Sequence, residues 1–228
     1  MNRIVFDIEC MGLDFDELDD ITQHSLLNNC KDKKECDETK ERTSLWPVTG
    51  EIVAIGMLNI DTDNAKVYFR KNNGESDEYE NDGIIYKIGS EKEILEWFWE
   101  DVQHFDQVIT FNGRGFDAPY ILFRSMVHDV KPTMNLMPNR YGDYRKGFNS
   151  HLDLLDQLSH FGATRKFSLH MYSQALGIDS PKEGGVSGLD VPRLFKNGEF
   201  ETIAGYCMRD VYATAELFRK WEIVNSNL

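Results

Sequence analysis

The sequence predicts an α/β sandwich with a mixed central β-sheet. Apolar runs of strand length occupy much of the first half of the chain, and helical patterns interleave with the later strands and then dominate. No repeat or linker divides the 228 residues. Helices that alternate with strands in this way pack as layers against a sheet. A chain of this length builds one substantial core, so we expect a single domain over residues 1–228.

Composition is typical of an ordinary soluble protein, with 41% hydrophobic and 28% charged residues. No apolar run reaches membrane-spanning length, and the first strand pattern begins within three residues of Met1, which leaves no room for a signal peptide. The four cysteines form no metal-binding pattern, so reduced thiols are expected. We therefore expect a cytoplasmic protein without a membrane partner.

The expected strands are residues 3–9, 51–58, 65–70 and 107–112, with a short apolar segment at 84–88. The second strand has the pattern of a fully buried strand, and residues 65–70 are its expected hairpin partner. A polar insertion at about 14–48 separates the first two strands. Its start has loose helical spacing, and its lysine-rich remainder is expected to be solvated. Residues 71–82 are expected to form an acidic loop.

The expected helices cover residues 90–105, a segment that begins near residue 117, and residues 152–160, 168–176, 190–196 and 199–221. Ser90, followed three residues later by Glu93, predicts a capping box at the first of these helices. Pro119 falls in the first turn of the second helix, where a missing backbone N–H is tolerated. Residues 131–150 are rich in Pro, Gly and Asn, and are expected to be irregular.

Charge is unevenly distributed along the chain. The formal net charge of −14 argues against a protein that coats duplex nucleic acid. Residues 118–170, in contrast, carry seven basic and four acidic side chains. This basic segment suits a protein that grips a phosphate backbone locally, and a solvated surface loop fits it nearly as well.

Two acids one residue apart end the first strand. Successive side chains of an extended segment point to opposite faces, so Ile4, Phe6 and Ile8 share one face. Asp7 and Glu9 share the other. Adjacent carboxylates on an apolar strand must be neutralised, and a divalent metal is the usual solution. A strand end with two solvated acids is the alternative.

Three further residues share this acidic chemistry. Asp117 follows a strand and a glycine turn at the position of a helix N-cap, a structural role that would explain it equally well. Tyr206 and Asp210 are four residues apart in the last predicted helix, so they share one helix face. The order of these motifs matters more than any one of them: a strand-end D-x-E, an N-G-x-x-F-D after a later strand, and a Y-x-x-x-D in the terminal helix.

In these motifs the chain resembles the DEDD 3′–5′ exonucleases of the tyrosine-bearing branch, in particular free-standing enzymes similar to the proofreading domain of family B DNA polymerases. The matching segments are residues 6–9, 111–117, 151–156 and 206–210. The resemblance implies an RNase H-like three-layer sandwich with a mixed central sheet. It also implies a site for two divalent cations, which in two-metal phosphoryl transfer lie about 3.5–4 Å apart.

The resemblance assigns a role to each motif residue. Asp7 would bridge both cations, Glu9 and Asp210 would hold the cation on the nucleophile side, and Asp117 would support the second through water. Hard oxygen ligands favour Mg²⁺ or Mn²⁺. Tyr206 would orient the attacking water, because a phenol with an ordinary pKa of about 10 is a poor base at neutral pH.

The implied activity is release of nucleoside monophosphates from single-stranded or frayed 3′ ends. The polymerase-like resemblance favours DNA, although nothing in the chain visibly reads or excludes the 2′-hydroxyl of RNA. An inactive nucleic-acid-binding module of the same fold is a further alternative. The candidate substrate contacts are Asn112, Phe116, His151, Arg124 and Lys182. The oligomeric state is not predicted.

Two other motifs compete with this interpretation. Residues 113–118 fit the dinucleotide fingerprint G-x-G-x-x-A, but no second strand ending in an acid follows at the expected distance. His151 and Asp156 fit the third motif of the histidine-bearing exonuclease branch, which would supply a general base. We favour Tyr206 over His151, because Tyr206 lies in a long terminal helix at a spacing from Asp117 that accommodates the intervening helices.

Overall fold

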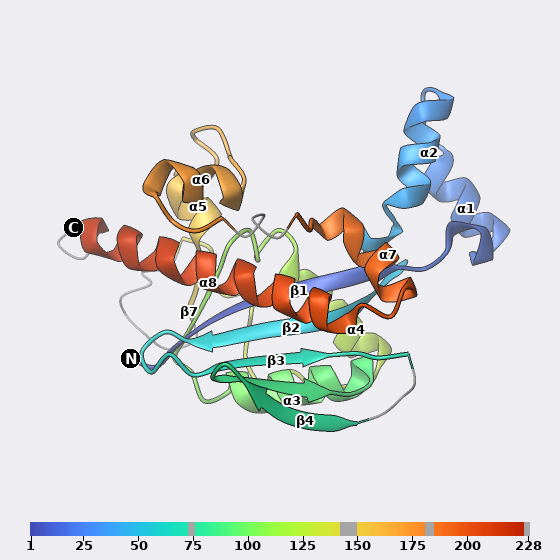
Figure 1. Cartoon of the computed structure of the whole chain (residues 1–228). Coiled ribbons are helices and arrows are strands. Elements are labelled where there is room, and N and C mark those ends of the chain that lie inside the picture. The colour runs from blue at the N-terminus through green and yellow to red at the C-terminus, as the bar shows by residue number, and fades with distance from the viewer. Residues whose placement is uncertain (73–75, 142–149, 181–184, 226–228) are drawn as a thin grey trace.

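A mixed seven-stranded sheet organises the chain (Figure 1). The structure, a computed structural model, describes residues 1–72, 76–141, 150–180 and 185–225. The strand order is β4-β5-β3-β2-β1-β6-β7. Neighbours pair antiparallel except for three parallel pairs, β3–β5, β1–β6 and β6–β7. The strands are β1 Arg3–Gly12, β2 Gly50–Asn59, β3 Ala65–Phe69, β4 Asp77–Asn81, β5 Ile84–Ile88, β6 Gln107–Thr110 and β7 Ser150–Asp153.

Helices cover both faces of this sheet. The longest helix, α8, packs against β1, β2 and β3, and α3 and α4 pack against the opposite face. Within the described residues, no helix has both the length and the apolar composition needed to cross a bilayer. The helices are α1 Asp20–Leu27, α2 Lys33–Glu41, α3 Glu91–Val102, α4 Asp117–Val127, α5 Leu154–Leu158, α6 Leu169–Leu176, α7 Val191–Lys196 and α8 Phe200–Asn225.

The alternation of β1 divides its side chains between two cores. Ile4, Phe6 and Ile8 pack with α3 and α4, whereas Val5 packs in the cluster that contains α8. The predicted α/β class and the predicted division of the β1 side chains are both confirmed. Asp7, which lies between Phe6 and Ile8, is therefore directed to the α8 face.

Two strands differ from what the sequence patterns predicted. Strand β4 lies within the expected acidic loop, and its five residues are largely exposed. Strand β7 occupies the start of the expected helix at 152–160, and α5 begins only at Leu154. Both strands are short and lie at the two edges of the sheet, where pairing with one neighbour decides the conformation.

The polar insertion folds into two short helices, α1 and α2. Each begins at an aspartate whose side chain accepts backbone N–H groups, Asp19 for α1 and Asp32 for α2. Figure 1 shows both helices extending away from the sheet. The insertion contacts the body beside α7, where Lys196 Nζ lies 3.3 Å from Asp14 Oδ2.

Candidate active site

Strand β1 supplies two acids to the face covered by α8. Asp7 is half-buried, and Glu9 is 6% exposed. Directly after Glu9 the pairing with β2 shifts by one residue: Glu9 lies opposite Ala54, and the next residue of β1 lies opposite Ile52. The extra residue, Val53, packs in the same cluster as Ala54. A bulge of this kind re-aims the chain locally and is frequent beside functional sites.

Asp117 reaches these acids from α4. The residue before it, Phe116, occupies the N-cap position and makes no side-chain capping bond, so Asp117 is the first helical residue. Its Oδ1 instead accepts a hydrogen bond of 3.1 Å from the backbone N–H of Ile8, the residue between Asp7 and Glu9. The capping role that sequence alone allowed for Asp117 is therefore not the one it has.

Asp153, at the end of β7, holds the turn that leads into α4. Its Oδ1 accepts the backbone N–H of Asn112 at 2.9 Å, and its Oδ2 accepts that of Arg114 at 3.0 Å. Asn112 has a positive φ of 64°, which asparagine tolerates better than most residues. The sequence motifs assigned no role to Asp153. Its position two residues after His151, within a segment that matches the exonucleases, was the available signal.

Helix α8 brings Tyr206, Cys207 and Asp210 to the same place. Gly56 of β2 lies opposite Asp7, and a Cβ there would lie only 3.1 Å from Cys207 Sγ. The missing side chain thus lets α8 approach the sheet closely. The Cys207 thiol donates to the backbone carbonyl of Asp7 at 3.5 Å.

The four acids act on one another electrostatically. Burial raises the pKa of Asp7 well above its ordinary range, and the charges of Asp117, Asp210 and Glu9 add to the effect. Burial, Asp210 and Asp117 likewise raise the pKa of Glu9, against a small lowering by Arg209. Burial raises the pKa of Asp117 to about 7. These carboxylates therefore lie close enough together to resist simultaneous ionisation.

Tyr206 shares this environment. Burial raises the pKa of its hydroxyl, and the negative charges of Glu9, Asp210 and Asp7 and a hydrogen bond with Asp210 raise it further. The phenol consequently stays protonated at any physiological pH.

The donor set fits a divalent cation. One ligand atom each from Asp7, Glu9 and Cys207 lie within 4.8 Å of one another. Buried carboxylates whose pKa values rise together are under-neutralised, and a cation relieves that cost. Cys207 was missed as a potential donor, because its sequence context resembles that of an ordinary buried cysteine. Its place three residues before Asp210 on the same helix was the only signal.

Two of the expected substrate contacts lie elsewhere. His151 is buried, its Nε2 is 2.7 Å from Thr110 Oγ1, and its Nδ1 is 2.8 Å from the carbonyl of Leu136. Burial lowers the pKa of His151 to about 4, so the ring is neutral. Arg124 is also buried and forms a bidentate ion pair with Glu91. The structure therefore brings neither residue to the acids.

Phe116 and Asn112 do border the site. Phe116 is half-buried and lines a cleft of about 220 Å³ together with Glu9, Ser44 and Leu45. Asn112 lies in the turn before Phe116. Lys182 lies outside the described residues, as do Tyr144, Arg145, Lys146 and Phe148 of the basic segment.

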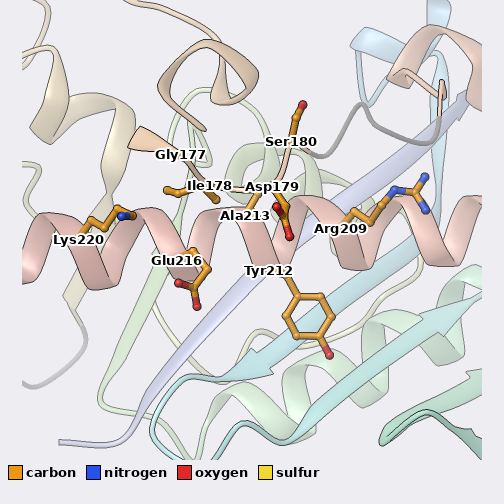
Figure 2. A pocket seen from close by; sticks show the side chains of 9 residues that line it. All are labelled: Gly177, Ile178, Asp179, Ser180, Arg209, Tyr212, Ala213, Glu216 and Lys220. Atoms are coloured by element: carbon orange, nitrogen blue, oxygen red, sulfur yellow. The ribbon is translucent and has the colours of Figure 1, made fainter. Parts of the chain in front are cut away.

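A larger groove runs along α8 beside the acids (Figure 2). Its volume is about 620 Å³, and the 177–180 loop forms its other wall. Figure 2 shows Arg209 toward one end of the helix segment and Lys220 toward the other. Asp179 and Glu216 offset these two cations. Only the Arg209 end, next to Asp210 in sequence, adjoins the acids.

Comparison with solved structures defines the class of the fold. The chain superimposes on the family B DNA polymerase of the archaeon Pyrobaculum calidifontis with a TM-score of 0.61 and 17% identity, over 96% of this chain and 24% of the polymerase. At this identity the match speaks for the fold alone. Together with the mixed sheet, it shows the predicted α/β architecture, consistent with an RNase H-like fold.

Residues 48–228 match the model of a family described as predicted 3′–5′ exonucleases related to the exonuclease domain of PolB, and the chain belongs to this family. Strand β1, with Asp7 and Glu9, precedes the matched residues. The resemblance inferred from the motifs is thereby confirmed at the level of the family.

Curated relatives are DNA polymerases. The chain is 27% identical over 188 residues to DNA polymerase 1 of Sulfolobus acidocaldarius, which covers 78% of the chain and 20% of the polymerase. It is 29% identical over 150 residues to a DNA polymerase of Desulfurococcus, which covers 60% of the chain and 19% of that protein. It is also 27% identical over 152 residues to the catalytic polypeptide of DNA polymerase epsilon from Saccharomyces cerevisiae, with 63% and 7% covered. The chain thus spans a fifth or less of these relatives.

Proposed function

We propose that this protein is a metal-dependent 3′–5′ exonuclease that releases nucleoside monophosphates from single-stranded or frayed 3′ ends of DNA. One observation carries the proposal: β1, α4 and α8 bring Asp7, Glu9, Asp117 and Asp210 within mutual electrostatic reach. The family description and the DNA polymerase relatives support this activity.

Each acid has a proposed share in holding two divalent cations, Mg²⁺ or Mn²⁺. Asp7 contributes to both, Glu9 and Asp210 to the one on the nucleophile side, and Asp117 to the other through water. Bound cations of this kind supply an activated water and stabilise the leaving oxygen. The oxygen-rich set favours hard cations, and the thiol of Cys207 is a softer neighbour.

Tyr206 orients the nucleophilic water in this mechanism. Its raised pKa keeps the hydroxyl protonated, so it acts as a hydrogen-bonding group and not as a base. Phe116, beside Glu9, is placed to stack on the terminal base. Gly115 and Asn112 bring main chain to the same edge of the site.

RNA remains a second candidate substrate, since the described site contains no group that a 2′-hydroxyl would contact unfavourably. The DNA polymerases among the relatives favour DNA. Matched DNA and RNA oligonucleotides of one sequence, digested side by side, distinguish the two.

The proposed function is tested with a single-stranded oligonucleotide labelled at its 3′-terminal nucleotide. We expect release of labelled mononucleotide in Mn²⁺ and its near-complete loss in Asp7→Asn and Glu9→Gln, because each removes a charge that holds a cation. Glu96→Gln, an exposed acid of α3 on the opposite face of the sheet, is the control and should retain activity.

Failure of the wild-type protein to cut any DNA or RNA, single- or double-stranded, would contradict the proposal and favour an inactive binding module.

A further inference from the structure

A second cleft borders the turn that carries Asp117. Its volume is about 530 Å³, and its lining includes three cations, Arg114, Arg140 and Lys166. Asn112 and Gly115 of the turn also line it. Phe116 of the same turn lines the small cleft that contains Glu9. One turn therefore borders both the acids and a cluster of cations, which no part of the proposed mechanism uses.

The two carboxylates in this cleft are already engaged. Asp156 accepts from Arg140, with Oδ2 2.7 Å from Nε and a second bond to Nη2. Asp153 accepts backbone N–H groups from the turn and from Leu155 at the start of α5, at 2.9 Å. Neither carboxylate forms an ion pair with Arg114 or Lys166 in the described part of the chain. These two cations therefore keep their charge available for an anion that enters the cleft.

Arg114 is short of an acceptor. Its Nη2 donates to the carbonyl of Pro138, whereas its Nη1 is buried and has no hydrogen-bond partner among the described residues. A buried donor without an acceptor costs free energy, and a guanidinium next to a phosphate satisfies such donors in pairs. Lys166 is exposed at the same cleft and forms no ion pair with any described residue.

We infer that this cleft binds an internal phosphodiester of the strand whose 3′ end lies at the acids, through Arg114 and Lys166. The inference rests on the proposed function and adds the place where the strand is held upstream of the scissile bond. Arg114 precedes Asp117 by three residues, so a rigid turn couples the grip on the strand to the acid. A local phosphate site also explains how a chain of net charge −14 holds an anionic polymer.

Binding of a single-stranded oligonucleotide with a hydrolysis-resistant 3′-terminal phosphorothioate tests the inference. We expect Lys166→Gln and Arg114→Gln each to weaken binding about 3- to 10-fold and to reduce the slope of log K against log salt by about 0.7, the value for one lost phosphate contact on a single strand. Lys131→Gln removes an exposed cation of the basic segment outside the cleft and should leave the slope unchanged.

A neutral methylphosphonate, moved along the oligonucleotide one linkage at a time, locates the phosphate. At one internal position it should weaken binding to the wild type and have no further effect on Lys166→Gln. Free nucleoside monophosphate should bind the wild type and Lys166→Gln equally; a loss of its binding in the variant would place the released product in the cleft and overturn the inference. Lys166 is exposed, so this variant tests the cleft even if Arg114→Gln does not fold.

The outcomes separate the two proposals. An active wild-type protein whose Lys166→Gln and Arg114→Gln variants bind with unchanged affinity and salt dependence overturns the cleft alone. A wild-type protein that releases no nucleotide, yet loses binding in Lys166→Gln with the position dependence described, contradicts the exonuclease and supports the cleft.

Discussion

At the residue scale, proton and cation compete for the same carboxylates. Burial raises the pKa of Asp117 from an ordinary 3.8 to about 7. Between these pH values the folded, metal-free protein keeps a proton that the unfolded chain has released, so this residue lowers stability as the pH rises. Asp117→Asn removes that dependence. In a chelator, we expect the unfolding free energy of the variant, relative to wild type, to rise by about 4 kcal/mol from pH 4 to pH 7.

Denaturant unfolding at a series of pH values measures this difference. His151, whose pKa burial lowers to about 4, acts in the opposite direction, because its unfolded form binds more protons below its ordinary value of 6.5. Its contribution is common to both proteins and cancels in the comparison. A difference that does not change with pH would contradict the assigned environment of Asp117.

Tyr206 offers a second test at this scale. Tyr206→Phe removes the hydroxyl and keeps the buried ring, so we expect turnover to fall on the order of 100-fold while Mn²⁺ binding, measured by calorimetry, is retained. His151→Gln should lower stability and leave turnover per folded molecule unchanged. If His151→Gln abolished turnover and Tyr206→Phe did not change it, the preference for Tyr206 would be wrong.

At the scale of elements, local sequence signals predicted what depends on neighbours in the chain. The alternation in β1 and the capping box of Ser90 with Glu93 are both observed. Strand β4, with three acids in five residues, has little intrinsic strand preference, and only pairing with β5 makes it a strand.

The site was predictable in its acids and not in its supports. The order of the motifs indicated which carboxylates belong together. The hydrogen bond from Ile8 to Asp117 and the grip of Asp153 on the turn each join residues about 40 to 110 positions apart in sequence. No periodicity or capping signal reports contacts at such separation, because they arise only once the sheet has formed.

The contact between β2 and α8 yields a prediction at this scale. Gly56→Val places side-chain atoms where Cys207, Met208 and Val211 already pack, at 3.0–3.1 Å from the added Cβ. We expect a loss of about 1–3 kcal/mol in stability. Turnover should fall on the order of 100-fold for a displacement of about 1 Å between α8 and Asp7.

Gly205→Ala is the matched control on α8. A Cβ there comes no nearer than 3.8 Å to other atoms, so this variant should be slightly more stable and fully active. Unfolding curves and mononucleotide release measure both variants. Full activity of Gly56→Val would show that the close approach of α8 is not required.

At the scale of the whole molecule, a net charge of −14 makes the cation a condition for binding nucleic acid at the site. The acids repel the scissile phosphate until cations are bound. We expect affinity for a hydrolysis-resistant single strand to rise on the order of tenfold or more from chelator to Mn²⁺, since like charges in contact cost several kcal/mol. Fluorescence anisotropy measures this. An affinity that is the same in chelator and in Mn²⁺ would contradict the prediction.

The exposed strand β4 has a consequence for concentrated solutions of this protein. Its outer backbone groups have no partner strand in the described sheet, and an open edge of this kind is the usual template for aggregation. The strand carries Asp77, Glu78 and Glu80, and two such edges brought together would repel each other. The negative charge here thus protects the fold from self-association, and its neutralisation would favour fibrous assembly.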